Sequence, residues 1–134
     1  MKVAVDSSVL LDVLTADPLY GERSREALRA AYDTGPLVAC EIVWAEVRAH
    51  FQTDAEFAEA MKKLGIRFEA IFDDAAAKAG QLWRELRREG GASRVRVIAD
   101  LLIGAHALMQ SDALLTRDRG FYRSRFKGLR IVEP

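Results

Sequence analysis

Residues 2–10 read KVAVDSSVL, a short apolar run that ends at an acid and two serines. The run has the length and apolarity of a buried strand, and residues 9–14 carry apolar side chains at helix spacing. Ser7 or Ser8 is the expected N-cap of that helix, because a hydroxyl accepts a hydrogen bond from the N–H groups that a first turn leaves unpaired. The stretch therefore predicts a strand followed at once by a helix, with Asp6 at the junction.

The same alternation continues along the chain. Short apolar runs predict further strands at residues 37–39, 66–71, 113–115 and 129–132. Patterns of helical period predict helices at residues 20–33, 41–51, 53–64 and 97–110, with Thr53 opening the third of these. A further helix is predicted to run through residue 88, with either Asp73 or Asp74 as its N-cap. Strands that alternate with helices are typical of a parallel sheet covered on both faces. The sequence thus predicts an α/β fold.

The composition narrows the class of protein. The length of 134 residues fits one domain, which we expect to span residues 1–134. Cys40 is the single cysteine, so an intrachain disulfide is impossible and a cysteine-rich zinc site is excluded. We expect a cytoplasmic protein with no signal peptide and no membrane span, since Asp6 interrupts the first apolar run and Asp100 the longest.

Charge is unevenly distributed along a chain whose net charge is zero. Residues 1–77 carry 8 Lys and Arg against 14 Asp and Glu, whereas residues 78–134 carry 12 against 6. Such asymmetry is consistent with a basic face for a polyanion, and equally with a solvated helix face and a basic tail. Several basic residues bracket Asp118, and we expect Arg117 and Arg119 among them to contact the RNA backbone if the ligand is RNA.

Two acids follow predicted strands. Asp6 comes directly after the first strand, and Asp118 comes three residues after the strand at 113–115. In open α/β sheets, ligands bind outside the carboxyl ends of the strands. We therefore expect both carboxylates to project from the same rim of the sheet.

Two further acids lie within apolar helices. Glu46 stands between Ala45 and Val47, and Asp100 stands in the most apolar helix of the chain. A carboxylate is rarely buried without a partner, because losing its hydration is costly. Taken singly, each acid has an alternative interpretation: a helix cap for Asp6, a surface residue for Glu46, an ion pair with Arg94 or Arg96 for Asp100, and a turn residue for Asp118.

Taken together, the four acids indicate a site for a hard cation. Carboxylates gathered in one pocket repel one another, and a divalent cation relieves that repulsion. Oxygen ligands alone suit magnesium, manganese or calcium rather than zinc. An acidic pocket of this kind is a natural place for phosphodiester cleavage, where metal ions position water and neutralise developing charge.

Four stretches of the sequence carry a resemblance to a known family. They are VAVDSSVLL at residues 3–11, WAEV at 44–47, ADLLIGAHAL at 99–108 and LLTRDRGFY at 114–122. Together, in this order, they resemble the PIN-domain family and, within it, the VapC toxins of bacterial toxin–antitoxin pairs. The resemblance assigns the catalytic and metal-binding acids to Asp6, Glu46, Asp100 and Asp118, and the hydroxyls beside the site to Ser8 and Thr116.

This resemblance implies a PIN-like three-layer α/β/α sandwich with a short, mostly parallel central sheet. It implies an endoribonuclease that uses Mg²⁺ or Mn²⁺, in which a metal-activated water attacks phosphorus in line and leaves a 5′-phosphate and a 3′-hydroxyl. It also implies a VapB-like antitoxin and a homodimer with two active sites in one groove. Two features depart from the family: many relatives have Asn where Ser8 stands, and residues 94–98 lack the extra acid that often precedes the third.

Other interpretations remain. A non-catalytic PIN module that binds RNA or protein is the main alternative, although retention of all four acids argues against it. A phosphatase of the haloacid dehalogenase type needs a second acid where Ser8 stands. His106 lies about 240° around its helix from Asp100, so we expect it to take part in core packing or a buried hydrogen bond. We expect His50 to lie at the surface of a helix end.

Overall fold

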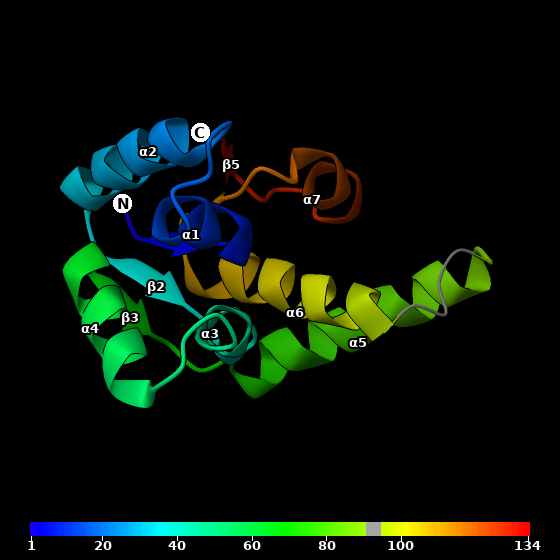
Figure 1. Cartoon of the computed structure of the whole chain (residues 1–134). Coiled ribbons are helices and arrows are strands. Elements are labelled where there is room, and N and C mark those ends of the chain that lie inside the picture. The colour runs from blue at the N-terminus through cyan, green and yellow to red at the C-terminus, as the bar shows by residue number, and fades with distance from the viewer. Residues whose placement is uncertain (91–94) are drawn as a thin grey trace.

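The computed structural model describes residues 1–90 and 95–134, without the side chains of residues 95 and 96. The strands are β1 (Val3–Val5), β2 (Leu37–Ala39), β3 (Ile66–Phe68), β4 (Ala113–Leu115) and β5 (Ile131–Val132). The helices are α1 (Ser7–Leu14), α2 (Gly21–Thr34), α3 (Glu41–Arg48), α4 (Asp54–Leu64), α5 (Asp73–Arg88), α6 (Val95–Gln110) and α7 (Arg119–Arg125). Figure 1 shows the strands at the centre of the molecule with helices around them.

The strands form one sheet in the order β3-β2-β1-β4-β5, and each neighbouring pair is parallel. Strand β1 pairs with β2 on one side and with β4 on the other, so β1 is the central strand. Every residue of β1, β2 and β4 is buried, as expected for short apolar strands covered on both faces. The expected parallel sheet is confirmed.

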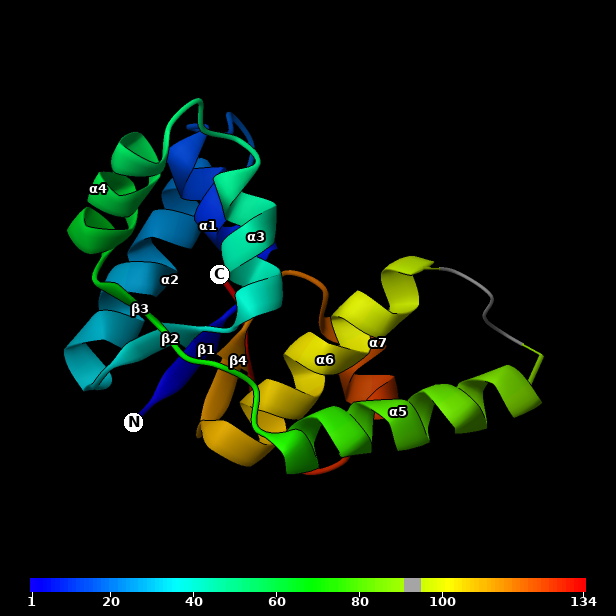
Figure 2. The same ribbon diagram turned by 90° about the horizontal axis from the view of Figure 1, so that it is seen from below.

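Helices cover both faces of this sheet and complete three layers. In Figure 2, α1, α2 and α4 lie on one side of the strands, and α5 and α6 lie on the other, with α7 beside α6. Right-handed crossovers produce this arrangement, because the chain moves outward in one direction from β1 to β3 and in the opposite direction from β4 to β5. Within the described residues, no helix combines the length and apolarity needed to cross a membrane.

The strand order reverses between β1 and β4, and this reversal positions the site. The chain leaves the carboxyl end of β1 for α1 and β2 on one side, and leaves β4 for α7 and β5 on the other. The two connections therefore diverge and open a crevice at the carboxyl rim. Ligands of open α/β folds bind at such a topological switch point.

Several helix starts differ from the sequence-based expectation. The N-cap of α1 is Asp6, whose carboxylate accepts a hydrogen bond from the Ser7 N–H, so the helix begins two residues earlier than predicted. Likewise α5 begins after Phe72, and Asp73 lies inside the first turn, where its carboxylate accepts from the next N–H group. At α1 the acid bonds the neighbouring amide and takes the cap position, whereas α5 begins without a side-chain cap. Thr53 does cap α4 as predicted, accepting from the Glu56 N–H.

Other elements differ in extent. The strand predicted at 66–71 ends at Phe68, the one at 129–132 begins at Ile131, and α3 ends at Arg48 rather than at residue 51. Helix α7 was not predicted, since it is short and contains Gly120, which lowers helix propensity. Burial of Tyr122 against the core stabilises it instead.

Candidate active site

A cavity of about 870 Å³ opens at the carboxyl rim where the strand order reverses. It is lined by parts of α1, α3, α6 and the connection from β4 to α7. The acids among its lining residues are Asp6, Asp12, Asp17, Glu46, Asp100 and Asp118. The four acids predicted from the sequence therefore line a single cavity, although up to 112 residues separate them.

Asp6 lies at the bottom of this crevice, only 6% exposed. Thr116 donates its hydroxyl to one carboxylate oxygen at 2.7 Å, and the Ser7 N–H donates to the other at 2.8 Å. Burial raises the pKa of the Asp6 carboxyl, these hydrogen bonds oppose the rise, and the charges of Glu46 and Asp118 add to it. Asp6 is thus a buried acid held by neutral donors next to other acids.

Thr116 also fixes the residues that follow β4. Its hydroxyl oxygen accepts a hydrogen bond from the Asp118 N–H at 2.9 Å while donating to Asp6. Asp118 precedes α7, but its carboxylate makes no capping bond to that helix and is exposed to the cavity. Ser8, the other predicted hydroxyl, lies 3.5 Å from the Asp6 carboxylate. Both predicted hydroxyls therefore contact Asp6.

Glu46 and Asp100 reach the cavity from α3 and α6, which pack against each other. The Oε1 atom of Glu46 is buried, and it has no hydrogen-bond partner among the described residues. A buried carboxylate oxygen without a donor is costly, and a bound cation would remove that cost. Asp100 is half-buried, and its alternative ion pair with Arg94 or Arg96 falls outside the described residues and side chains.

Tyr122 was not predicted as part of the site. This α7 residue is fully buried, and its hydroxyl has no hydrogen-bond partner in the described part of the chain. Burial raises the pKa of this hydroxyl, and the negative charges of all four predicted acids (Asp6, Asp100, Asp118 and Glu46) raise it further. The hydroxyl therefore lies within the electrostatic reach of the whole acid set. In the sequence Tyr122 stands between Phe121 and Arg123, and no pattern there indicates that its hydroxyl lies near the acids.

The other two acids of the cavity are engaged by the chain itself. Arg117 and Ser24 both bond the Asp12 carboxylate, and the N–H groups of Leu19 and Tyr20 bond Asp17 at 2.9 and 2.8 Å. Arg117 thus compensates the charge of Asp12, and the two N–H groups satisfy a carboxylate oxygen of Asp17. The other four acids that line the cavity are the ones that sequence analysis selected.

The donor chemistry of the pocket suits a hard cation. It offers carboxylate oxygens from four segments and a buried Glu46 oxygen without a donor. Within the described residues, no group of three or more His, Cys, Asp or Glu side chains is arranged so that it could hold a metal ion as it stands. A bound ion would therefore have to draw the carboxylates closer together.

The predicted RNA-contacting arginines are engaged in ion pairs. Arg117 bonds Asp12 at 2.7 Å, and Arg119 bonds the exposed Glu133 at 3.0 Å. Surface pairs such as Arg119–Glu133 contribute little to stability and exchange readily for other anions. Contact between RNA and either arginine stays a prediction.

The histidines behave as expected from their positions. His106 is 1% exposed, and its Nε2 atom lies 2.9 Å from Glu69 in a buried hydrogen bond away from the acids. His50 is exposed at the end of α3, with Nδ1 3.2 Å from the Glu46 carbonyl oxygen, and it lines the rim of the cavity.

Comparison with known families gives one match over almost the whole chain. The model of the PIN domain family matches residues 3–127, which include all four acids. No curated protein matches the chain.

Several solved structures have a similar fold, among them VapBC and FitAcB structures and one toxin. VapBC2 from Rickettsia felis, bound to a promoter DNA fragment, has a TM-score of 0.76 at 15% identity, covering 100% of this chain and 99% of that chain. FitAcB from Neisseria gonorrhoeae has a TM-score of 0.64 at 20% identity, covering 96% and 95%. VapC20 from Mycobacterium tuberculosis, a sarcin-ricin loop cleaving toxin, has a TM-score of 0.57 at 16% identity, covering 91% and 94%. At these identities the likeness demonstrates a shared fold.

Proposed function

Because the chain belongs to the PIN-domain family, we propose that it is a metal-dependent endoribonuclease whose active site is the acidic cavity. The observation that carries the proposal is the convergence of Asp6, Glu46, Asp100 and Asp118 at the switch point of the sheet. An acidic cavity repels the phosphates of RNA unless a cation offsets its charge. The proposed cofactor is therefore Mg²⁺, or Mn²⁺ in its place.

The residues of the chain have distinct roles in this proposal. When bound, the cation offsets the carboxylate charges and activates the water that attacks the scissile phosphate. Asp6, held by Thr116 and the Ser7 N–H, offers its oxygens in a fixed direction. Glu46 contributes the buried oxygen for which the described residues supply no donor, and Asp118 contributes an exposed carboxylate.

The cellular role proposed is that of the toxin in a toxin–antitoxin pair. Structures similar in fold are complexes of this kind, and one of them is named as a toxin that cleaves the sarcin-ricin loop. The corresponding partners are an RNA substrate and a VapB-like antitoxin. A homodimer and a cytoplasmic location stay predictions that follow from the same resemblance.

The alternative is a PIN module that binds RNA or protein without cleaving. Loss of one or more acids would favour that alternative, whereas this cavity holds all four. The proposed nuclease activity also accounts for the buried Glu46 oxygen that has no donor in the described part of the chain, which a binding module has no reason to maintain.

A cleavage assay with a matched variant tests the proposal. The purified chain is incubated with single-stranded RNA in Mg²⁺, in Mn²⁺ or in EDTA, alongside a folded Asp100→Asn variant. We expect cleavage with either metal, products with 5′-phosphates, and no cleavage in EDTA or by the variant. Turnover at the wild-type rate by Asp100→Asn would refute the site, and metal-supported RNA binding without cleavage would favour the non-catalytic alternative.

A further inference from the structure

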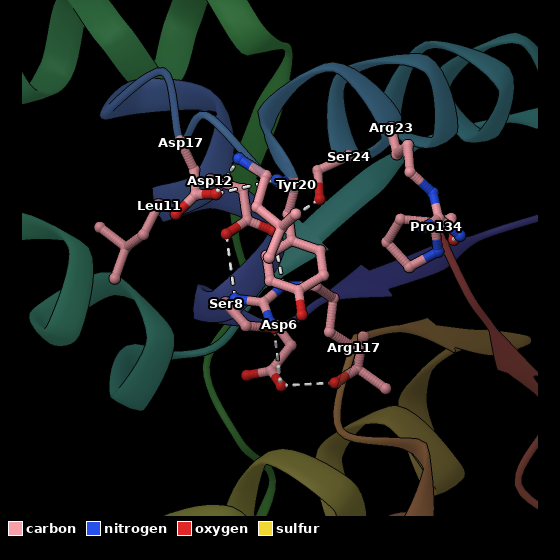
Figure 3. A network of polar contacts seen from close by, with 12 residues as sticks. Asp6, Ser8, Leu11, Asp12, Asp17, Tyr20, Arg23, Ser24, Arg117 and Pro134 are labelled. Atoms are coloured by element: carbon pink, nitrogen blue, oxygen red, sulfur yellow. Dashed lines mark hydrogen bonds and ion pairs between the residues drawn. The ribbon is translucent and has the colours of Figure 1, made fainter.

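Asp12 and Arg117 form a partly buried ion pair next to the proposed active site, in which the carboxylate is buried and the guanidinium is about one-third exposed. The guanidinium donates to both carboxylate oxygens, from Nε to Oδ2 at 2.7 Å and from Nη2 to Oδ1 at 3.0 Å. The Asp12 side chain is 4% exposed, and Ser24 on α2 donates its hydroxyl to the same carboxylate at 2.6 Å. Asp12 thus joins α1, α2 and the connection after β4. Figure 3 shows these contacts gathered beside Asp6.

The pair is arranged to hold Arg117 in one place. Two parallel N–H···O bonds fix the plane of a guanidinium as well as its position. The ring of Tyr20 covers its other side, with the guanidinium carbon 4.1 Å from the ring centroid. The N–H of Tyr20 is in turn bonded to Asp17 at 2.8 Å. A side chain with this many contacts is costly to move toward a passing phosphate.

Consecutive residues attach the β4–α7 connection to α1. Thr116 bonds Asp6 at the start of the helix, and Arg117 bonds Asp12, six residues further along it. Asp118 follows directly, with its N–H bonded to the Thr116 hydroxyl. Two anchors on one helix therefore determine where the backbone of Asp118 lies.

From this geometry we propose that Arg117 is a positioning residue of the cation site, which acts through Asp12 to hold Asp118 against the cavity. The inference rests on the proposed cation site, and it gives Arg117 a role other than contact with RNA. In this role Asp12 binds the guanidinium and keeps it away from the four acids of the proposed cation site. Ser24 and Tyr20 hold that pair in position.

The role of the charge can be separated from the role of the position. Removing a positive charge beside an acidic cavity strengthens cation binding, because a repulsion disappears. Removing a positioning contact weakens it, as substitutions of residues that orient metal ligands do, by about 10- to 100-fold. The double variant Asp12→Asn/Arg117→Gln leaves the net charge of the chain unchanged. It removes the two parallel hydrogen bonds between the guanidinium and the carboxylate.

The experiment is calorimetric titration of the RNA-free chain with Mn²⁺ alone. It compares the wild type with Asp12→Asn/Arg117→Gln, with Arg117→Lys and with Arg123→Gln. Arg123 is the matched control, since it belongs to the adjoining helix and pairs only with the exposed Glu133 in the described structure. Lysine keeps the positive charge but cannot form the two parallel hydrogen bonds of a guanidinium. Thermal melts show which variants are folded at the titration temperature, and hydrogen exchange of the Asp118 amide reports its bond to Thr116.

We expect the double variant to bind Mn²⁺ at least about tenfold more weakly, with faster Asp118 exchange, and Arg117→Lys to show the same trend. Arg123→Gln should bind as the wild type does. If the double variant is unfolded, the Mn²⁺ affinity of Arg117→Lys is compared with that of the wild type instead. Undiminished Mn²⁺ affinity in the folded variants overturns the inference. A wild-type chain that binds no Mn²⁺ overturns the cation site itself and the inference with it.

Discussion

Two acids six residues apart at α1 are almost equally buried, but their surroundings are opposite. Asp12, 3% exposed, is paired with the guanidinium of Arg117 and the hydroxyl of Ser24. Asp6, 6% exposed, receives only neutral donors among the described residues, chiefly the Thr116 hydroxyl and the Ser7 N–H. The chain supplies a cation for one acid and places further acids beside the other.

This difference shows that burial alone does not identify a functional acid. Both side chains lose their hydration, which is costly unless charge returns from elsewhere. For Asp12 the compensation is internal, so its role can be structural. For Asp6 the nearby charges of Glu46 and Asp118 increase the cost, and burial with these charges raises its pKa. An acid that a fold maintains in this way is a candidate ligand for an external cation.

The largest expected effect separates the two acids by activity. Asp6→Asn should lower RNA cleavage by about a thousandfold or more, because it removes a charge that the transition state needs through the metal. Asp12→Asn should retain measurable cleavage, since Asp12 acts only through Arg117. Initial rates at saturating Mg²⁺ compare the two variants. An equal loss of cleavage rate in both folded variants would contradict the different roles assigned to Asp6 and Asp12.

A smaller effect is expected at the hydroxyl that links the site together. Thr116→Val removes the donor to Asp6 and the acceptor for the Asp118 N–H. We expect Mn²⁺ affinity to fall about 10- to 100-fold, as it does when residues that orient metal ligands are lost. Thr116→Ser is the matched control, since it keeps the hydroxyl, and its affinity should remain close to that of the wild type. If valine and serine behave alike, the hydroxyl has no part in orienting Asp6.

The stability of the two α1 variants should show the reverse order. Asp12→Asn leaves Arg117 without its carboxylate, and we expect the free energy of unfolding to fall by at most about 2 kcal/mol. The loss is limited because the Arg117 side chain is about one-third exposed, so solvent screens its charge. Asp6→Asn relieves repulsion and should leave stability unchanged or higher in the absence of metal. Urea denaturation with a common slope measures both. A greater loss for Asp6→Asn would contradict the assignment of roles.

The smallest effect extends the comparison to a third acid, Glu69, which bonds Lys2 at 2.5 Å and His106 at 2.9 Å. Burial lowers the pKa of His106, although Glu69 and Glu41 oppose this and Lys2 adds to it. The folded chain therefore binds fewer protons than the unfolded chain just below the ordinary histidine pKa. This contribution to stability is present above about pH 6.5 and is lost as the pH falls, by at most about 1.4 kcal/mol per pH unit.

His106→Gln tests this pH dependence, because glutamine does not titrate. The free energy of unfolding of the variant should change less between pH 6.5 and 5 than that of the wild type. Denaturation at several pH values in this interval gives both slopes. Identical slopes would show that His106 is not the group responsible.

The sequence was informative where local pattern and topology coincide. The runs at residues 37–39 and 113–115 identified strands with correct bounds, and the rule for carboxyl ends placed Asp6 and Asp118 on one rim. The pairing of Asp12 with Arg117 was not accessible, because 105 residues separate the two and neither occurs in a distinctive pattern. Helix α7 and Tyr122 were missed for the same reason, since tertiary burial rather than local propensity holds them.

The central claim is that the carboxylates of Asp6, Glu46, Asp100 and Asp118 bind a divalent cation. Crystals of the chain soaked with Mn²⁺ and measured at the manganese absorption edge test it most directly. We expect an anomalous peak within about 2.0–2.3 Å of oxygens from at least two of these carboxylates, as short carboxylate–metal distances require. A well-ordered structure at high Mn²⁺ with no peak among them, or with its strongest peak at other residues, would contradict the account.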